Sequence, residues 1–350
     1  MQFHSPRHTV FQGLFPEVPD FRQQQLEKAL FERGFSSLEE VSTLPREWRS
    51  QLEEARYNWF TYGNHFVQKS KSGDTFKALL TLEDGKQIET VLMKNRRGHW
   101  SVCVSSQVGC AMACTFCATG KMGFTRNLTV DEILDQYRFW EQYLHQYPDL
   151  AQYISNIVFM GMGEPLANYA NVKEVLRLIL TYTEIGPTRI TVSTVGLIPM
   201  LEYILNDESF PPVRLAVSLH SADSQSRKDM MPTSYDDFLE KLLSWTKRYF
   251  EKFESRRRHL TFEYVMLSKV NDTEMHAKKL VSFARTVGKV RINLIPYNFT
   301  GEVYRDSLPG DFEKFESILA AAGVNVTKRR TMGDDIDAAC GQLANIKQNS

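Results

Sequence analysis

The sequence contains few cysteines and no long apolar segment. Five cysteines occur among 350 residues, an odd and small number that does not suit the disulfide framework of a secreted protein. Residues 1–10 lack the apolar core of a signal peptide, and no apolar run approaches the roughly 18 residues of a membrane-spanning helix. These absences predict a cytoplasmic protein whose thiols serve metal binding or catalysis, with no membrane association.

An excess of charge of either sign is also absent. The chain carries 42 basic and 42 acidic residues, so net charge gives no support for a nucleic-acid partner. Three basic runs occur at residues 94–97, 256–259 and 328–330. Such runs are more often solvated loops or strand ends than phosphate-binding patches.

Four of the five cysteines gather within residues 103–117, and three of them have the spacing Cys110-x3-Cys114-x2-Cys117. Three thiolates in one short loop can bind three irons of a [4Fe-4S] cluster, which normally has four cysteine ligands, so one iron stays open. A zinc site is the main alternative, but structural zinc takes four ligands, usually as two pairs. No second pair lies nearby, so the spacing favours an iron–sulfur cluster over zinc or buried structural thiols.

Helix-start signals and residue periodicity predict a helical domain, a β-hairpin and a further strand in order along the chain. Residues 1–62 have helix-start signals at Asp20, Ser37 and Pro45, which predict a small helical accessory domain with a first helix over 21–33. A period of two then appears on both sides of a turn, which predicts a β-hairpin extension over residues 63–95. In the following strand, Trp100 and Val102 lie on one apolar face, and Cys103 lies on the opposite face.

The rest of the chain alternates between strand-like and helix-like segments. Candidate strands are 156–160, 189–193, 213–218, 260–267 and 290–295, and candidate helices are 129–146, 172–182, 199–206, 237–250, 274–286 and 311–322. With the strand at Cys103, this alternation predicts an α/β fold with about six β/α units forming a partial barrel over residues 96–335. A C-terminal segment, residues 336–350, carries Cys340.

Polar residues and glycines follow several predicted strands. They occur at residues 161–165, 193–194, 218–220 and 296–298. Because sites in such folds lie at the carboxyl ends of the strands, these residues predict one pocket facing the cysteine loop. A lone Gly-x-Gly or a lone histidine would more often be a tight turn or a core residue.

Several long motifs resemble the RlmN/Cfr family of radical S-adenosylmethionine (SAM) RNA methyltransferases. They are CVSSQVGC (103–110), FCATG (116–120), RNLT (126–129), FMGMGEPL (159–166) and GDDIDAACGQL (333–343). The resemblance extends over nearly the whole chain and includes Phe21, Arg22 and Gln25. It implies a partial (β/α)6 radical SAM barrel and an enzyme that methylates an adenine of 23S rRNA.

The resemblance also implies roles for individual residues. Cys110, Cys114 and Cys117 match the ligands of a [4Fe-4S] cluster. Cys340 matches a cysteine that is methylated and then linked to the substrate, Cys103 matches the partner that helps to release the product, and Glu89 matches a proton acceptor. Seven residues match SAM-binding positions: Gly163, Glu164, Ser193, Ser218, Leu219, His220 and Asn298.

The chemistry of adenine explains why a cysteine carries the methyl group in this family. Ring carbon 2 is electron-poor and does not attack the methyl of SAM, whereas a thiolate does. The resemblance implies two SAM molecules per turnover, one that methylates Cys340 and one that generates a radical at the cluster. A Cys103–Cys340 disulfide then forms as the methylated base leaves, after deprotonation by Cys103 or Glu89.

The family has two branches, which leaves the methylated carbon open at this point. The motifs favour the branch that methylates carbon 2, with an adenine of the tRNA anticodon loop as a second substrate, and the alternative is carbon 8, as in antibiotic resistance. The implied partners are 23S rRNA, tRNA and a low-potential reductant such as flavodoxin or ferredoxin, and the enzyme is expected to be a monomer. A different class, a non-catalytic iron–sulfur or zinc interaction protein, leaves Cys103 and Cys340 unexplained.

Overall fold

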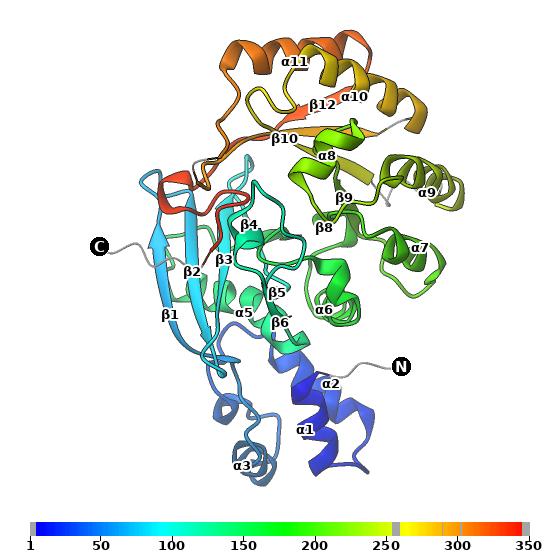
Figure 1. Ribbon diagram of the computed structural model, residues 1–350. Helices are drawn as coiled ribbons and strands as arrows, with labels where there is room; N and C mark the ends of the chain where they lie inside the picture. The colour runs from blue at the N-terminus through cyan, green and yellow to red at the C-terminus, as the bar shows by residue number, and fades with distance from the viewer. Residues whose placement is uncertain (1–4, 254–259, 289, 302, 345–350) are drawn as a thin grey trace.

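A ten-stranded sheet forms the centre of the computed structural model, which describes residues 5–253, 260–288, 290–301 and 303–344 (Figure 1). The strand order is β1-β2-β3-β4-β7-β8-β9-β10-β11-β12. The strands are β1 (Tyr62–Lys69), β2 (Thr75–Leu82), β3 (Gln87–Lys94), β4 (Trp100–Cys103), β7 (Ile154–Phe159), β8 (Ile190–Thr194), β9 (Arg214–Ser218), β10 (Leu260–Met266), β11 (Arg291–Pro296) and β12 (Asn325–Lys328). Two short strands, β5 (Gln107–Gly109) and β6 (Phe124–Asn127), pair separately.

From β4 to β12 every neighbouring pair of strands in the main sheet is parallel. Helices follow the strands and lie along the outer side of the curved sheet (Figure 1). Strand β7 shows why these segments form strands, because Ile154, Ile157 and Phe159 are buried in the hydrophobic core. The predicted α/β fold with a partial barrel of β/α units is confirmed.

The six predicted helices of the barrel begin and end close to their predicted positions, and the structure adds the short helices α4 and α8. They are α4 (Ala118–Lys121), α5 (Val130–Gln146), α6 (Tyr169–Tyr182), α7 (Ile198–Asn206), α8 (Ser224–Met230), α9 (Phe238–Lys252), α10 (Glu274–Val287) and α11 (Pro309–Ala321). Short 3₁₀ turns lie at η2 (Pro165–Asn168), η3 (Pro187–Arg189) and η4 (Asp334–Ile336). The predicted capping box of α5 is present, since Thr129 and Glu132 each accept a backbone N–H from the other.

The predicted hairpin is formed by β2 and β3, and the structure adds β1 on its outer side. Strand β1 was not predicted because most of its side chains are solvent-exposed and show no apolar alternation. Strand β3 pairs antiparallel with β4, so the hairpin continues the barrel sheet. The extension and the barrel therefore share one continuous sheet.

The N-terminal residues form α1 (Pro6–Leu14), α2 (Asp20–Ala29), η1 (Leu38–Glu40) and α3 (Arg46–Glu54), around their own apolar core. Helix α1 was missed, and the helix predicted over 21–33 ends at Ala29. Beyond Ala29 the backbone tightens into three-residue turns, and the carbonyl of Leu30 accepts a hydrogen bond from Arg138 Nε at 2.7 Å. Ser37 forms the predicted capping box, although the helix that follows is only one 3₁₀ turn.

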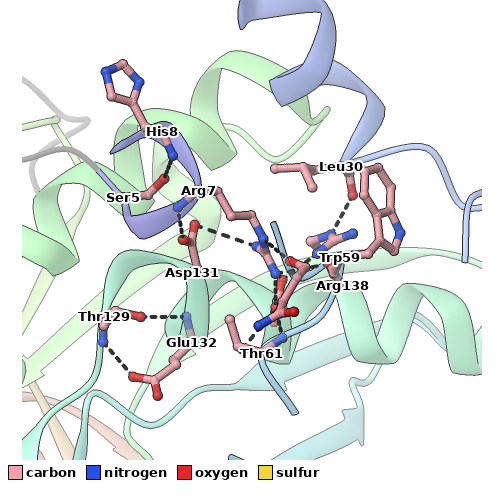
Figure 2. A network of polar contacts seen from close by, with 12 residues as sticks. Ser5, Arg7, His8, Leu30, Trp59, Thr61, Thr129, Asp131, Glu132 and Arg138 are labelled. Carbon is pink, nitrogen blue, oxygen red and sulfur yellow. Dashed lines mark hydrogen bonds and ion pairs between the residues drawn. The ribbon is translucent and has the colours of Figure 1, made fainter. Parts of the chain in front are cut away.

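A buried polar network fastens these helices to α5 (Figure 2). Arg7 Nη1 of α1 donates to Asp135 Oδ1 at 3.0 Å, and Arg138 lies within ion-pair distance of the same carboxylate. Burial alone would raise the pKa of Asp135, but the two guanidinium groups hold it below its ordinary value. Thr61 adds a backbone N–H bond to Asp135 at 2.8 Å. The network fixes α1 relative to the barrel.

The helices of the described chain are either too short or too polar to cross a lipid bilayer.

Candidate active site

A cavity of about 160 Å³ opens at the carboxyl ends of the barrel strands. It brings together residues that are far apart in the sequence, from the cysteine loop to the C-terminal segment. Its lining includes Cys110, Cys114, Cys117, Gly163, Glu164, Ser193, Ser218, His220 and Cys340. The structure thus places eight of the ten predicted cluster and SAM residues around one cavity, joined by Cys340.

The cysteine loop leaves the barrel through the small sheet of β5 and β6. Gly109 has a φ of +73°, and a Cβ at this position would lie 1.9 Å from the carbonyl oxygen of Gly123, so only glycine fits. Cys110 N–H donates to that same oxygen at 2.9 Å, and Cys117 precedes α4 as its N-cap residue. These contacts hold the three thiols at the mouth of the barrel.

Burial raises the pKa of all three loop thiols, and that of Cys110 reaches about 12. A thiol in such a place stays protonated near neutral pH until a metal replaces its proton. In the described part of the chain, no three His, Cys, Asp or Glu side chains converge on one point for a single metal ion. Each cysteine of a cubane cluster binds a different iron, so convergence is not required. The thiol set fits a [4Fe-4S] cluster with one open iron.

Glu164 lies deep in the cavity and is 2% exposed. Burial raises its pKa from 4.5 to about 7, although backbone N–H groups of Val195 and Leu166 donate to its carboxylate at 2.7 and 2.9 Å. Gly163 has a φ of +102°, and a Cβ there would meet Gln107 at 2.6 Å. A buried carboxylate beside this close backbone turn suits the ammonium group of an amino acid.

His220 lies on the opposite wall of the same cavity and contacts the cysteine loop. Its Nδ1 accepts the backbone N–H of Val265 at 3.0 Å, and its ring packs edge-on against Phe116. Burial lowers the pKa of His220 to about 3, so the ring is neutral and its Nε2 carries the hydrogen. Leu219 is fully buried. Unlike its neighbours Ser218 and His220, it does not line the cavity.

Cys340 also lines a second cavity of about 180 Å³, which shares Ile295 and Arg329 with the first. Asn298 lines this second cavity rather than the first, and its Nδ2 donates to the carbonyl of Cys340 at 3.1 Å. The predicted SAM residue Asn298 therefore holds the backbone of the segment that carries Cys340. The side chain of Cys340 is exposed and lies between the two cavities.

Cys103 ends β4 and is 6% exposed, and it lines neither cavity. Burial, with a smaller effect of the nearby Cys340, raises its pKa to about 12. Cys103 and Cys340 are both free thiols in the structure. The pairing that the resemblance implies thus has its two cysteines close together, although 237 positions separate them in the sequence.

Glu89 of β3 does not line either cavity. It is 1% exposed and forms an ion pair with Lys77 Nζ at 3.0 Å. Its second carboxylate oxygen accepts the backbone N–H of Ala344 at 2.8 Å. Both carboxylate oxygens of Glu89 therefore contact other residues of the protein, one the side chain of Lys77 and the other the backbone of Ala344.

Sequence reasoning missed two charged residues of the site, Arg329 and Glu263. Both line the first cavity, and Arg329 also lines the second. The sequence predicted Arg329 to be part of a solvated strand end. Burial alone would lower its pKa, but Cys340 and Glu263 favour its charged form, and the pKa is raised. Arg329 directly follows β12, a strand that the sequence did not predict. The basic run 256–259 lies outside the described residues.

A barrel of parallel strands with three cysteines at its mouth defines a radical SAM enzyme. Residues 104–280 match the model of the radical SAM superfamily. A crystal structure of a radical SAM methyltransferase from Sphaerobacter thermophilus superposes with a TM-score of 0.86 and 33% identity, covering 97% of each chain. A protein of Rhodopirellula baltica named "Probable dual-specificity RNA methyltransferase RlmN" is 42% identical over 92% of this chain and 84% of its own length.

The chain belongs to the RlmN family of RNA methyltransferases within the radical SAM superfamily. It is an enzyme that uses SAM and a [4Fe-4S] cluster bound by cysteines.

Proposed function

We propose that this enzyme methylates carbon 2 of an adenine in 23S rRNA, and of an adenine in tRNA, through a methyl group carried by Cys340. The placement of Cys340 carries this proposal, since the exposed thiol joins the cavity of the cysteine loop to a second cavity. Cys103 lies close by as a second thiol outside the metal-binding set. The dual-specificity relative supports two RNA substrates.

Three cysteines and a group of cavity residues hold the cofactors in this proposal. Cys110, Cys114 and Cys117 bind the cluster, and Glu164 with Gly163 receives the amino acid moiety of SAM. Ser193, Ser218 and His220 line the rest of the SAM cavity, with Leu219 and Asn298 supporting its walls. When bound, the cluster and SAM supply a radical that removes a hydrogen atom from a methyl group.

The chain's own residues prepare and release the substrate. Cys340 acts as the nucleophile that takes the methyl group, because carbon 2 of adenine is too electron-poor to do so. Arg329 places a positive charge beside Cys340, where both residues line the two cavities. At the end of the reaction the Cys103 thiolate attacks the sulfur of Cys340, and the bond between that sulfur and the methylene carbon breaks. The carbon takes the electron pair and a proton to become the methyl group of the released base, and the two cysteines remain as a disulfide. Glu89 and Cys103 are the two candidates for the proton acceptor.

The target adenine must leave the stack of a folded RNA to reach the second cavity, as base-modifying enzymes require. The helical domain, residues 1–62, is proposed to contact the RNA backbone beside the barrel. The hairpin extension is assigned to 63–95, the radical SAM core to 96–335 and the cysteine segment to 336–350. The enzyme is proposed to act as a cytoplasmic monomer that receives electrons from flavodoxin or ferredoxin.

Nucleoside mass spectrometry of 23S rRNA and tRNA from a deletion strain tests the proposed function. We expect 2-methyladenosine to disappear from both RNAs and to return with the wild-type gene but not with Cys340→Ala. Loss of 8-methyladenosine instead would support the carbon-8 alternative. Iron and sulfide analysis of the anaerobically reconstituted protein should give about four of each per chain, and zinc without sulfide would contradict the proposal.

A further inference from the structure

The C-terminal segment that carries Cys340 lies against β2 and β3 of the extension, beside the end of β4 (Figure 1). Residue pairing places Lys77 opposite Val91 and Val91 opposite Cys103. Side chains that face each other across neighbouring strands share one side of the sheet, as do residues two apart in one strand. Lys77, Glu89 and Cys103 therefore all project from the same side, the one that the Cys340 segment covers.

Two oppositely charged residues on this side hold the segment at two points. Lys77 Nζ donates to the backbone carbonyl of Asp337 at 3.3 Å, three residues before Cys340. Glu89 accepts the backbone N–H of Ala344 at 2.8 Å, four residues after Cys340. The two side chains also form an ion pair at 3.0 Å. The pair thus connects both flanks of the reactive cysteine to one place on the sheet.

The burial of this pair is unusual for residues in a hairpin. Lys77 is 3% exposed and Glu89 is 1% exposed. Charged side chains are almost never this buried unless each is paired and hydrogen-bonded. Here each group makes one further hydrogen bond, to a backbone atom of the Cys340 segment. Removal of either partner leaves a buried charge without compensation.

We propose that the Lys77–Glu89 ion pair is a clasp that positions the Cys340 segment between the two cavities and beside Cys103. Lys77 and Glu89 act as positioning residues, which explains why the carboxylate of Glu89 faces Lys77 and Ala344 and lines neither cavity. The role of Cys340 in this inference rests on the proposed function, whereas the attachment of the segment does not.

The clasp is tested with Lys77→Met, Glu89→Gln and the conservative variant Lys77→Arg. Lys173→Met is the matched control, because Lys173 forms a partly buried ion pair with Asp207 elsewhere in the barrel. Hydrogen exchange of the peptide spanning residues 337–344 is measured by mass spectrometry in the reconstituted enzyme without RNA. Iron content and thermal melting verify that each variant is folded.

We expect exchange of this peptide to rise about tenfold or more in both Lys77→Met and Glu89→Gln, because each leaves the other partner buried without its ion pair. Lys77→Arg should restore protection, and Lys173→Met should leave the peptide unchanged. Formation of methyl-Cys340 on incubation with SAM should fall in parallel in the two disruptive variants. Unchanged exchange in folded Lys77→Met and Glu89→Gln would overturn the clasp.

A second measurement separates the clasp from a role of Glu89 as proton acceptor alone. If Glu89 acted only as a proton acceptor, the Lys77→Met variant would methylate RNA normally. Only the Glu89→Gln variant would then accumulate the covalent enzyme–RNA adduct. This outcome also overturns the clasp. If the wild-type enzyme methylated no RNA, the proposed function would fail, and hydrogen exchange of residues 337–344 would still decide the clasp.

Discussion

Cys340 differs from the metal-binding thiols in exposure, although it lines the same cavity. It is exposed and joins two cavities, whereas Cys114 is buried in an apolar group beside Met230 and Met231. Cys340→Ala should therefore retain about four irons per chain and lose RNA methylation completely. Iron analysis and methyl transfer to RNA measure the two properties. Loss of iron in this variant would show that Cys340 belongs to the metal site.

Glu164 makes the stability of the protein without cofactors depend on pH. Burial raises its folded pKa above the unfolded value, so the folded state retains a proton that the unfolded state releases. The resulting stabilisation is present below about pH 4.5 and is lost by about pH 7, a change of up to about 3 kcal/mol.

Glu164→Gln should remove this dependence. Urea unfolding of the cofactor-free protein at several pH values should show the variant gaining stability relative to the wild type as pH rises from 5 to 7.5. A constant difference between the two proteins across this range would contradict the assignment of the raised pKa to Glu164.

Individual residues differ in how far the sequence could place them. The spacing of Cys110, Cys114 and Cys117 predicted one metal-binding loop, because neighbours in sequence are neighbours in space. The buried Lys77 could not be predicted, since its burial depends on a segment 260 positions away. Arg329 was misinterpreted for the same reason, because only the folded barrel brings it against Cys340.

At the scale of the elements, the turn after β7 shapes the cavity. Its Gly163 has a positive φ and approaches Gln107 closely. Gly163→Ala should cost about 2 kcal/mol or more of stability and weaken SAM binding, because the added Cβ displaces Gln107 and Glu164. Equilibrium dialysis with SAM measures the binding. Gly186→Ala is the control, since a Cβ there meets nothing within 4 Å, and equal affinities in the two variants would argue against this role.

The elements that were predicted correctly have strong periodicity and clear caps. Helix α5 follows the capping box of Thr129, and the barrel strands carry apolar residues that are buried. Strands β1 and β12 were missed because both are largely exposed at the edges of the sheet. Helix α8 was missed because it is short and polar, with Asp223 as its N-cap.

At the scale of the whole molecule, one buried network joins the N-terminal helices to the barrel. Arg7→Met should destabilise the attachment of α1 by about 3–5 kcal/mol, since Asp131 and Asp135 lose a buried cation. RNA affinity should fall, and methylation of Cys340 by SAM should continue. Limited proteolysis and RNA-binding titrations measure these effects. The exposed Arg46→Met is the control, and unchanged proteolysis in Arg7→Met would contradict the prediction.

The contact between Ala344 and Glu89 spans 255 positions of the chain, which sets an order of events during synthesis. A ribosome makes the extension, the cysteine loop and every barrel strand before it makes Cys340. Because distant contacts form late in folding, the segment that carries Cys340 can join the sheet only after β2 and β3 have formed their hairpin. The position of Cys340 beside Cys103 is therefore established late in folding.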